Sequence, residues 1–252
     1  MDLGLTDRVF VVTAASGGLG RAGAEHLVAE GARVVLVARR VEVLDELVHQ
    51  LGADQAVALA GDLSDPCTAP SDADLALATF GRLDGALISV GGPPKGTVLD
   101  TSDDQWHEAF DSVFLAGLRV TRAVVAAATG PVALALVLSS SARTPLPAMA
   151  PSNGLRPGLA VLIKQLADEI GPAGGRVVGL LPGTVATERI DFLYGQTPDP
   201  GAARANAEAS IPLRRLGEPA EFARVATFLL SPAASYVTGS LVAIDGGAMR
   251  AL

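Results

Sequence analysis

A cluster of glycines and small residues near the start of the chain follows directly on an apolar run of strand length. The run 8–12 reads RVFVV, and the turn Thr13–Gly20 reads TAASGGLG. Gly18 and Gly20 leave no Cβ between the backbone and a ligand, and a helical pattern over 21–30 begins at once. Because free N–H groups and a helix N-terminus suit the charge of a pyrophosphate, the segment predicts a nucleotide-binding βαβ unit. An ordinary strand-to-helix turn is the simpler alternative.

A pair of arginines follows the second apolar run, 33–38 (RVVLVA). Ala38 occupies the place where an acidic residue would hold the 2′-hydroxyl of an adenine ribose, and Arg39 and Arg40 come next. A guanidinium suits a 2′-phosphate by charge and by bidentate geometry. The pair therefore predicts NADP(H) as the cofactor rather than NAD(H), with two surface arginines as the alternative.

Strand-like runs alternate with helical patterns along the whole chain, without a linker or a repeat. We expect further strands at 55–60, 85–90, 132–138, 176–181 and 241–244, and further helices at 41–51, 69–80, 103–128, 152–170 and 219–230. This alternation predicts an α/β fold, a Rossmann-type doubly wound parallel sheet of about seven strands with helices on both faces. We expect one domain over residues 1–252.

Ligands of such a sheet bind beyond the carboxyl ends of its strands. Around that crevice the pattern places Ala14–Gly20, Asp62, Ser89–Gly96, Ser139–Ser141 and Pro182–Thr187.

Composition limits the classes of function. The chain has 252 residues, is 49% hydrophobic and carries a formal net charge of −8, which argues against a nucleic-acid partner. No apolar stretch reaches membrane-spanning length, the start lacks signal-peptide features, and Cys67 is the single cysteine. We read His26, His49 and His107 as structural and expect no metal site. These features predict a cytoplasmic protein that acts on a small molecule, without a membrane partner.

Several motifs together resemble the short-chain dehydrogenase/reductase family over essentially the full length. The turn from Thr13 is similar to T-G-x-x-x-G-x-G with Ala14 at the first glycine, and 182–187 (PGTVAT) matches P-G-x-x-x-T. The C-terminal segments 211–221, 235–239 and 245–247 are the most specific. The resemblance implies cofactor contacts from Thr13, Ala15, Ser16, Gly18, Leu19, Gly20, Arg39, Arg40, Asp62, Leu63, Gly91, Arg156, Pro182, Gly183, Val185 and Thr187.

The expected catalytic set departs from the family pattern. Aligned with Y-x-x-x-K, the chain has Ser152 at the tyrosine and Arg156 at the lysine, which resembles a minority branch with S-N-x-x-R. The family's serine is present as Ser139, thirteen residues earlier, with Ser140 behind it. The two tyrosines, Tyr194 and Tyr236, fall in a mobile substrate-loop region and in the C-terminal motif. The candidate catalytic residues are therefore Ser139, Ser140, Ser152 and Arg156.

The substituted groups favour positioning over proton transfer. A guanidinium stays charged and cannot relay a proton, whereas Arg156 can hold ribose hydroxyls or an oxyanion. Ser139, Ser140 and Ser152 can polarise a carbonyl as hydrogen-bond donors. The alternatives are a helix N-cap for Ser152 and a surface or ion-paired Arg156. Lys95, in the Gly-Pro loop, is read as solvated rather than as part of the crevice.

Three hypotheses about function follow. The first is an NADP(H)-dependent reductase of a small carbonyl, or the reverse dehydrogenase, with an atypical proton path. The second is a non-redox enzyme in the same crevice, such as an isomerase, dehydratase or cyclase. The third is a cofactor-binding protein without catalysis. The apolar surfaces of 103–128, 219–230 and 241–244 also predict a homotetramer or homodimer, as in the resembling family.

Overall fold

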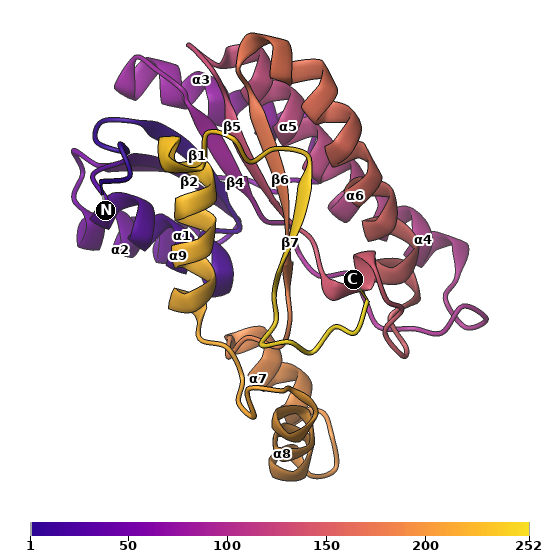
Figure 1. Ribbon diagram of the computed structural model, residues 1–252. Coiled ribbons are helices and arrows are strands. Elements are labelled where there is room, and N and C mark those ends of the chain that lie inside the picture. The colour runs from indigo at the N-terminus through magenta and orange to yellow at the C-terminus, as the bar shows by residue number, and fades with distance from the viewer. Residues whose placement is uncertain (1, 252) are drawn as a thin grey trace.

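The sheet in the computed structural model, which describes residues 2–251, contains seven parallel strands (Figure 1). Their order is β3-β2-β1-β4-β5-β6-β7, so the chain starts in the middle and winds outward in both directions, as predicted. The strands are β1 Val9–Thr13, β2 Arg33–Ala38, β3 Ala56–Ala60, β4 Gly85–Ile88, β5 Ala133–Val137, β6 Arg176–Pro182 and β7 Ser240–Ile244.

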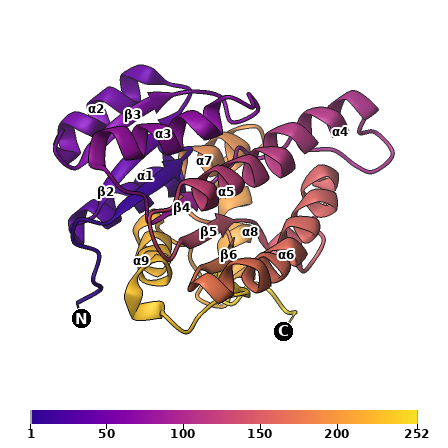
Figure 2. The same ribbon diagram turned by 90° about the horizontal axis from the view of Figure 1, so that it is seen from above.

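Helices cover both faces of the sheet (Figure 2). One face carries α1 Gly18–Ala29, α2 Val41–Leu51 and α9 Pro219–Leu230, and the other carries α3 Thr68–Phe80, α5 Ala116–Ala127 and α6 Ala150–Ile170. The remaining helices are α4 Asp103–Ala109, α7 Glu188–Gly195 and α8 Pro200–Ser210. Within residues 2–251, none of these helices is both long and apolar enough to span a lipid bilayer.

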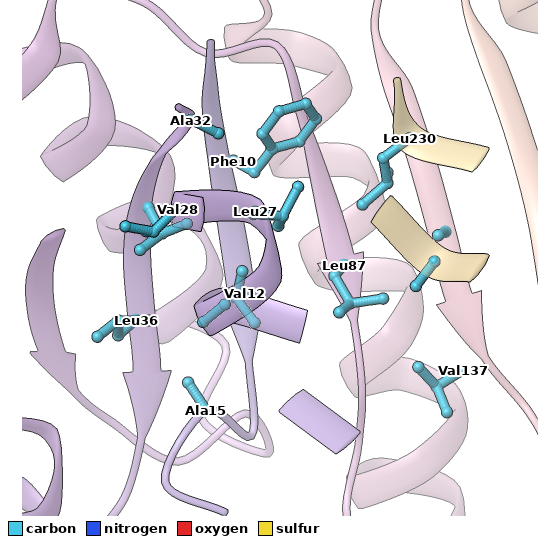
Figure 3. Close-up of a cluster of buried hydrophobic side chains, with 14 of the residues drawn as sticks. Phe10, Val12, Ala15, Leu27, Val28, Ala32, Leu36, Leu87, Val137 and Leu230 are labelled. Carbon is cyan, nitrogen blue, oxygen red and sulfur yellow. The ribbon is translucent and has the colours of Figure 1, made fainter. Parts of the chain in front are cut away.

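Alternate residues of the central strands enter two separate cores. Phe10 and Val12 of β1 point into the core under α1 and α9, where they pack near Leu27 and Leu230 (Figure 3). Val11 points into the core under α3, α5 and α6. Such burial on both faces explains why these strands are continuous apolar runs rather than alternating ones.

Two regions differ from the sequence prediction. The helix expected over 103–128 is interrupted by a π-helical segment, Phe110–Leu115, which joins α4 to α5. The stretch described as a mobile loop contains two helices, α7 and α8, which extend beyond the carboxyl ends of the strands (Figure 1). Asp199 caps α8 by accepting a hydrogen bond from the N–H of Ala202, and Pro200 opens its first turn. These capping signals were present in the sequence.

Candidate functional site

A crevice of about 470 Å³ opens at the carboxyl ends of the strands, the position expected for this topology. Its volume lies in the usual range for small-molecule sites. Residues after β1, β2, β4, β5 and β6 line it, together with the start of α7. Of the predicted site residues, those on its wall are Ser16, Gly18, Leu19, Gly20, Arg39, Arg40, Gly91, Ser139, Ser152, Arg156, Pro182, Gly183, Val185 and Thr187.

The turn between β1 and α1 is shaped by residues without bulk. A Cβ on Gly20 would lie 2.5 Å from the carbonyl oxygen of Ala14, so only glycine allows the helix to start this close to the strand. Gly18 adopts a φ of +53°, and Ala14 a φ of +52°, the left-handed region that glycine enters without strain. No side chain caps the N-terminus of α1. The turn therefore presents open backbone N–H groups, which fits a pyrophosphate.

Arg39 and Arg40 stand at the end of the crevice nearest β2. Arg40 donates to the carbonyl oxygen of Ser16 at 2.8 Å, and its guanidinium lies 3.9 Å from a carboxylate oxygen of Glu188. Arg39 is largely exposed, 3.8 Å from a carboxylate oxygen of Asp62. Each of these guanidinium groups therefore has one carboxylate within ion-pair distance, at the end of the crevice where the sequence predicts a 2′-phosphate.

Five predicted residues lie outside the crevice wall. The hydroxyl of Thr13 donates to the carbonyl oxygen of Ser89 at 2.6 Å and accepts from its N–H at 2.8 Å, so it joins β1 to the segment after β4. Asp62 accepts from the N–H and the hydroxyl of Ser64, which lowers its pKa. Ala15, Leu63 and Ser140 are also absent from the lining residues.

Three serines meet at the inner wall. The hydroxyl of Ser152, 2% exposed, lies 2.8 Å from the hydroxyl of Ser141. Ser139 accepts a hydrogen bond from the N–H of Ser141 at 3.1 Å, which leaves its own O–H free to donate into the crevice. Because α6 begins at Ala150, with Met149 at the N-cap, the reading of Ser152 as a helix cap is wrong.

Arg156 is a buried cation, 6% exposed. It donates to the carbonyl oxygen of Val137 at 2.9 Å, and burial, with a smaller contribution from the charge of Arg189, lowers its pKa to about 10. In residues 2–251 no carboxylate lies within ion-pair distance of this guanidinium. Arg156 is therefore neither a surface arginine nor an ion-paired one, the two alternatives that its sequence context allows. One of five N–H donors is used by the protein, and the rest can serve a ligand.

The crevice offers few proton donors. Glu188 is the one carboxylic acid among the described residues that line it. Tyr194, on α7, does not line the crevice, and burial raises the pKa of its phenol. Tyr236 is fully exposed. Lys95 is exposed and does not line the crevice, in agreement with its interpretation as a solvated loop residue.

In the described part of the chain, no three histidine, cysteine, aspartate or glutamate residues come together to hold a metal ion.

Two residues at this site are not among the candidates that the sequence indicates. Ser141 was placed near the crevice but not among the candidates, and it is the partner of the Ser152 hydroxyl. Arg189, two residues after the P-G-x-x-x-T motif, reaches back to the loop after β4 and donates to the carbonyl oxygen of Pro93 at 3.4 Å. Neither contact has a local sequence signal, because each depends on how distant segments pack.

The comparisons with known proteins bear on the family and the fold. The family model described as "Enoyl-(Acyl carrier protein) reductase" matches residues 13–249. The bovine "Dehydrogenase/reductase SDR family member 4" is 32% identical over 98% of this chain and 89% of its own length. The crystal structure of L-sorbose reductase from Gluconobacter frateurii, complexed with NADPH and L-sorbose, covers all of both chains with a TM-score of 0.93 and 28% identity.

A further solved structure is similar over nearly the whole chain. The apo structure of a short chain oxidoreductase from Pseudomonas aeruginosa PAO1, described as containing an atypical catalytic center, is 30% identical with a TM-score of 0.90. It covers 99% of this chain and 100% of the other.

Proposed function

Since the chain belongs to the short-chain dehydrogenase/reductase family of oxidoreductases, we propose that it is an NADP(H)-dependent enzyme that reduces a small carbonyl compound or oxidises the matching alcohol. One observation carries this proposal. A single crevice joins an open glycine turn with two arginines at one end to a serine hydroxyl and a buried guanidinium at the other. The first end suits the phosphates of the cofactor, and the second suits a carbonyl oxygen.

When bound, the cofactor supplies the hydride, and the protein supplies positioning and electrostatics. Ser139 donates a hydrogen bond to the carbonyl oxygen. Arg156 stabilises the negative charge that grows on that oxygen and also offers donors to the nicotinamide ribose. Because neither group releases a proton near neutral pH, the proton comes from water or from the substrate itself.

The relatives support both halves of the proposal. L-sorbose reductase was crystallised with NADPH, and it has the same fold over its full length. The Pseudomonas short chain oxidoreductase indicates that an unusual catalytic center occurs within this fold.

We also propose a single domain over residues 1–252. A cytoplasmic location is consistent with the single cysteine.

Titration of the purified protein with NADPH and NADH, followed by nucleotide fluorescence, tests the cofactor end. We expect NADPH to bind at least tenfold more tightly than NADH. Arg39→Ala should weaken NADPH binding about tenfold and leave NADH binding unchanged, because only NADPH carries the 2′-phosphate. Arg33→Ala, at the amino end of β2 and outside the crevice, is the control for the loss of one arginine charge. Equal affinities for the two nucleotides would refute the assignment.

A non-redox reaction is the second candidate, and the engaged hydroxyl of Ser152 favours it. That hydroxyl occupies the position of the family's proton donor yet is paired with Ser141. Turnover of a substrate without any change in NADPH absorbance would establish this alternative. Failure to bind either nucleotide would refute the reductase, and tight NADPH binding without turnover of any carbonyl or alcohol would favour the non-catalytic, cofactor-binding role.

A further inference from the structure

Arg189 lies over the loop that follows β4. Its guanidinium rests on the backbone at Gly92, where a Cβ would collide with it. Its hydrogen bond to the carbonyl oxygen of Pro93 is long, at 3.4 Å. No carboxylate in residues 2–251 lies within ion-pair distance of this guanidinium. The side chain is exposed on the loop backbone, and its charge has no carboxylate partner within the described residues, so its donors are available to a ligand in the crevice that it lines.

A second unmatched cation stands close by. Arg156 lines the same crevice, and the charge of Arg189 is near enough to disfavour the charged form of Arg156. Four arginines and one glutamate line the crevice, although the whole chain carries a net charge of −8. Two like charges that face one cavity without a counter-ion repel each other, and an anion between them removes that cost.

The position of this pair argues for a substrate group rather than a cofactor phosphate. Arg39 and Arg40 follow β2, and Ser139 follows β5, three strands away, or about 14 Å at the usual spacing. The phosphates have their own cradle at the glycine turn and at the arginines after β2. Arg156 donates to the carbonyl oxygen of Val137 at the end of β5, next to Ser139, and Arg189 lies over the loop after β4, between β5 and the glycine turn.

We propose that the inner end of the crevice binds the carboxylate of a small oxo acid, or of the matching hydroxy acid, between Arg156 and Arg189. This inference rests on the proposed function, and it narrows the substrate class. A guanidinium fork matches the two oxygens of a carboxylate. The buried guanidinium of Arg156 also discriminates against neutral analogues, because its donors would be left without partners.

Binding measured without turnover is the direct test. The probes are 2-oxobutanoate, 3-oxobutanoate and 4-oxopentanoate with their methyl esters, which vary the distance from carbonyl to carboxylate. Each is titrated at constant ionic strength into the complex with NADP+, which has no hydride to give, and Tm is recorded. We expect at least one acid to raise Tm and its ester to have no effect. Arg189→Gln should weaken that binding tenfold or more, Arg189→Lys should restore part of it, and Arg33→Gln should match the wild type.

The outcomes separate this inference from the proposed function. If no acid raises Tm more than its ester does, or if neutral ketones are reduced as well as the acids, the carboxylate site is refuted while the reductase can stand. A tenfold loss of NADPH affinity in Arg189→Gln would assign this arginine to the cofactor and also overturn the inference. Binding of the acids without NADPH oxidation by any carbonyl would leave the anion site standing and refute the reductase.

Discussion

The hydroxyl oxygens of Ser141 and Ser152 lie 2.8 Å apart, across the contact between the 3-10 turn Ser140–Ala142 and α6. Either hydroxyl of this pair can be the donor, and the sequence predicts that Ser152 stands where the family has its proton donor. Ser139, by contrast, accepts from a backbone N–H and keeps its own proton for a ligand. The two serines that line the crevice therefore have different neighbours, and we expect them to have different roles.

Substitution of these serines should separate the roles. Ser139→Ala should lower kcat/KM about 10²-fold or more, since it removes a donor aimed at the developing oxyanion. Ser152→Ala should cost less than about tenfold. Steady-state kinetics on one substrate, with thermal denaturation to verify folding, compares them. A larger loss for Ser152→Ala would make Ser152 the principal donor.

Arg156→Met should stabilise the fold and abolish most activity. A buried, unpaired guanidinium destabilises the protein, and its lowered pKa of about 10 reflects that cost. Because the folded-state pKa of Arg156 lies below the usual value of an arginine, the penalty is present in full at every pH below about 10. We therefore expect Tm to rise by a few degrees, equally at pH 6 and at pH 9, while turnover falls about 10²-fold or more.

The result that would contradict this account is a lower Tm for Arg156→Met. It would mean that the hydrogen bond to the carbonyl oxygen of Val137 outweighs the cost of the buried charge. Unchanged activity on a true substrate would remove the residue from the mechanism altogether.

Asp72 makes the stability of the protein depend on pH. This residue of α3 is fully buried, neither carboxylate oxygen has a hydrogen-bond partner, and burial raises its pKa to about 8. Between pH 4 and pH 8 the folded state keeps a proton that the unfolded state releases. Stability therefore falls as pH rises through this window and levels off above it.

Asp72→Asn should remove that dependence. We expect the Tm advantage of the variant over the wild type to be small at pH 4 and to grow to several degrees at pH 8. Asp45→Asn, an exposed change on α2, controls for the loss of one negative charge. An advantage that is constant with pH would show that Asp72 is ionised throughout.

An exposed apolar face supports the predicted homotetramer or homodimer. Phe110, 41% exposed, stacks on Phe114, and Val161 of α6 is 71% exposed. Covering this face with a second copy would bury both helices. We expect light scattering to detect a dimer or tetramer at micromolar concentration and Val161→Glu to reduce its size. A monomeric wild type would refute the prediction.

Much of the fold was predictable because its signals are local. The buried strands are continuous apolar runs, and α9 begins and ends where its proline and its apolar pattern indicate. Helix α7 was missed because its sequence, ERIDFLYG, has a weak apolar pattern. The π-helical segment changes the helix geometry but not the apolar content, so the pattern read as one continuous helix.

The candidate site was predictable only in part. Backbone constraints identify the glycine turn, and the order of the strands brings Arg40 and Ser139 to one crevice. The Ser141 contact spans eleven residues, and Arg189 contacts a loop 96 residues away. Such contacts follow from tertiary packing, which no local pattern encodes.

The last prediction concerns the proton path. Ser152→Tyr combined with Arg156→Lys restores the tyrosine and lysine that are usual in the family. Both positions line the crevice, and they lie one turn apart on α6. A phenol beside an ammonium is a far better acid than a serine hydroxyl, because the cation favours the phenolate. In a reductase that merely lacks its acid, we expect the double variant to gain tenfold or more in NADPH-dependent carbonyl reduction, within the usual range for general acid catalysis. Ser152→Tyr alone should gain less, because Arg156 is also committed to the carbonyl oxygen of Val137. NADPH oxidation by the wild type, the double variant and Ser152→Tyr, with NADPH affinity measured in parallel, makes the comparison. A double variant that binds NADPH normally but gains no reduction, and loses the wild-type reaction, would indicate a crevice adapted to another chemistry.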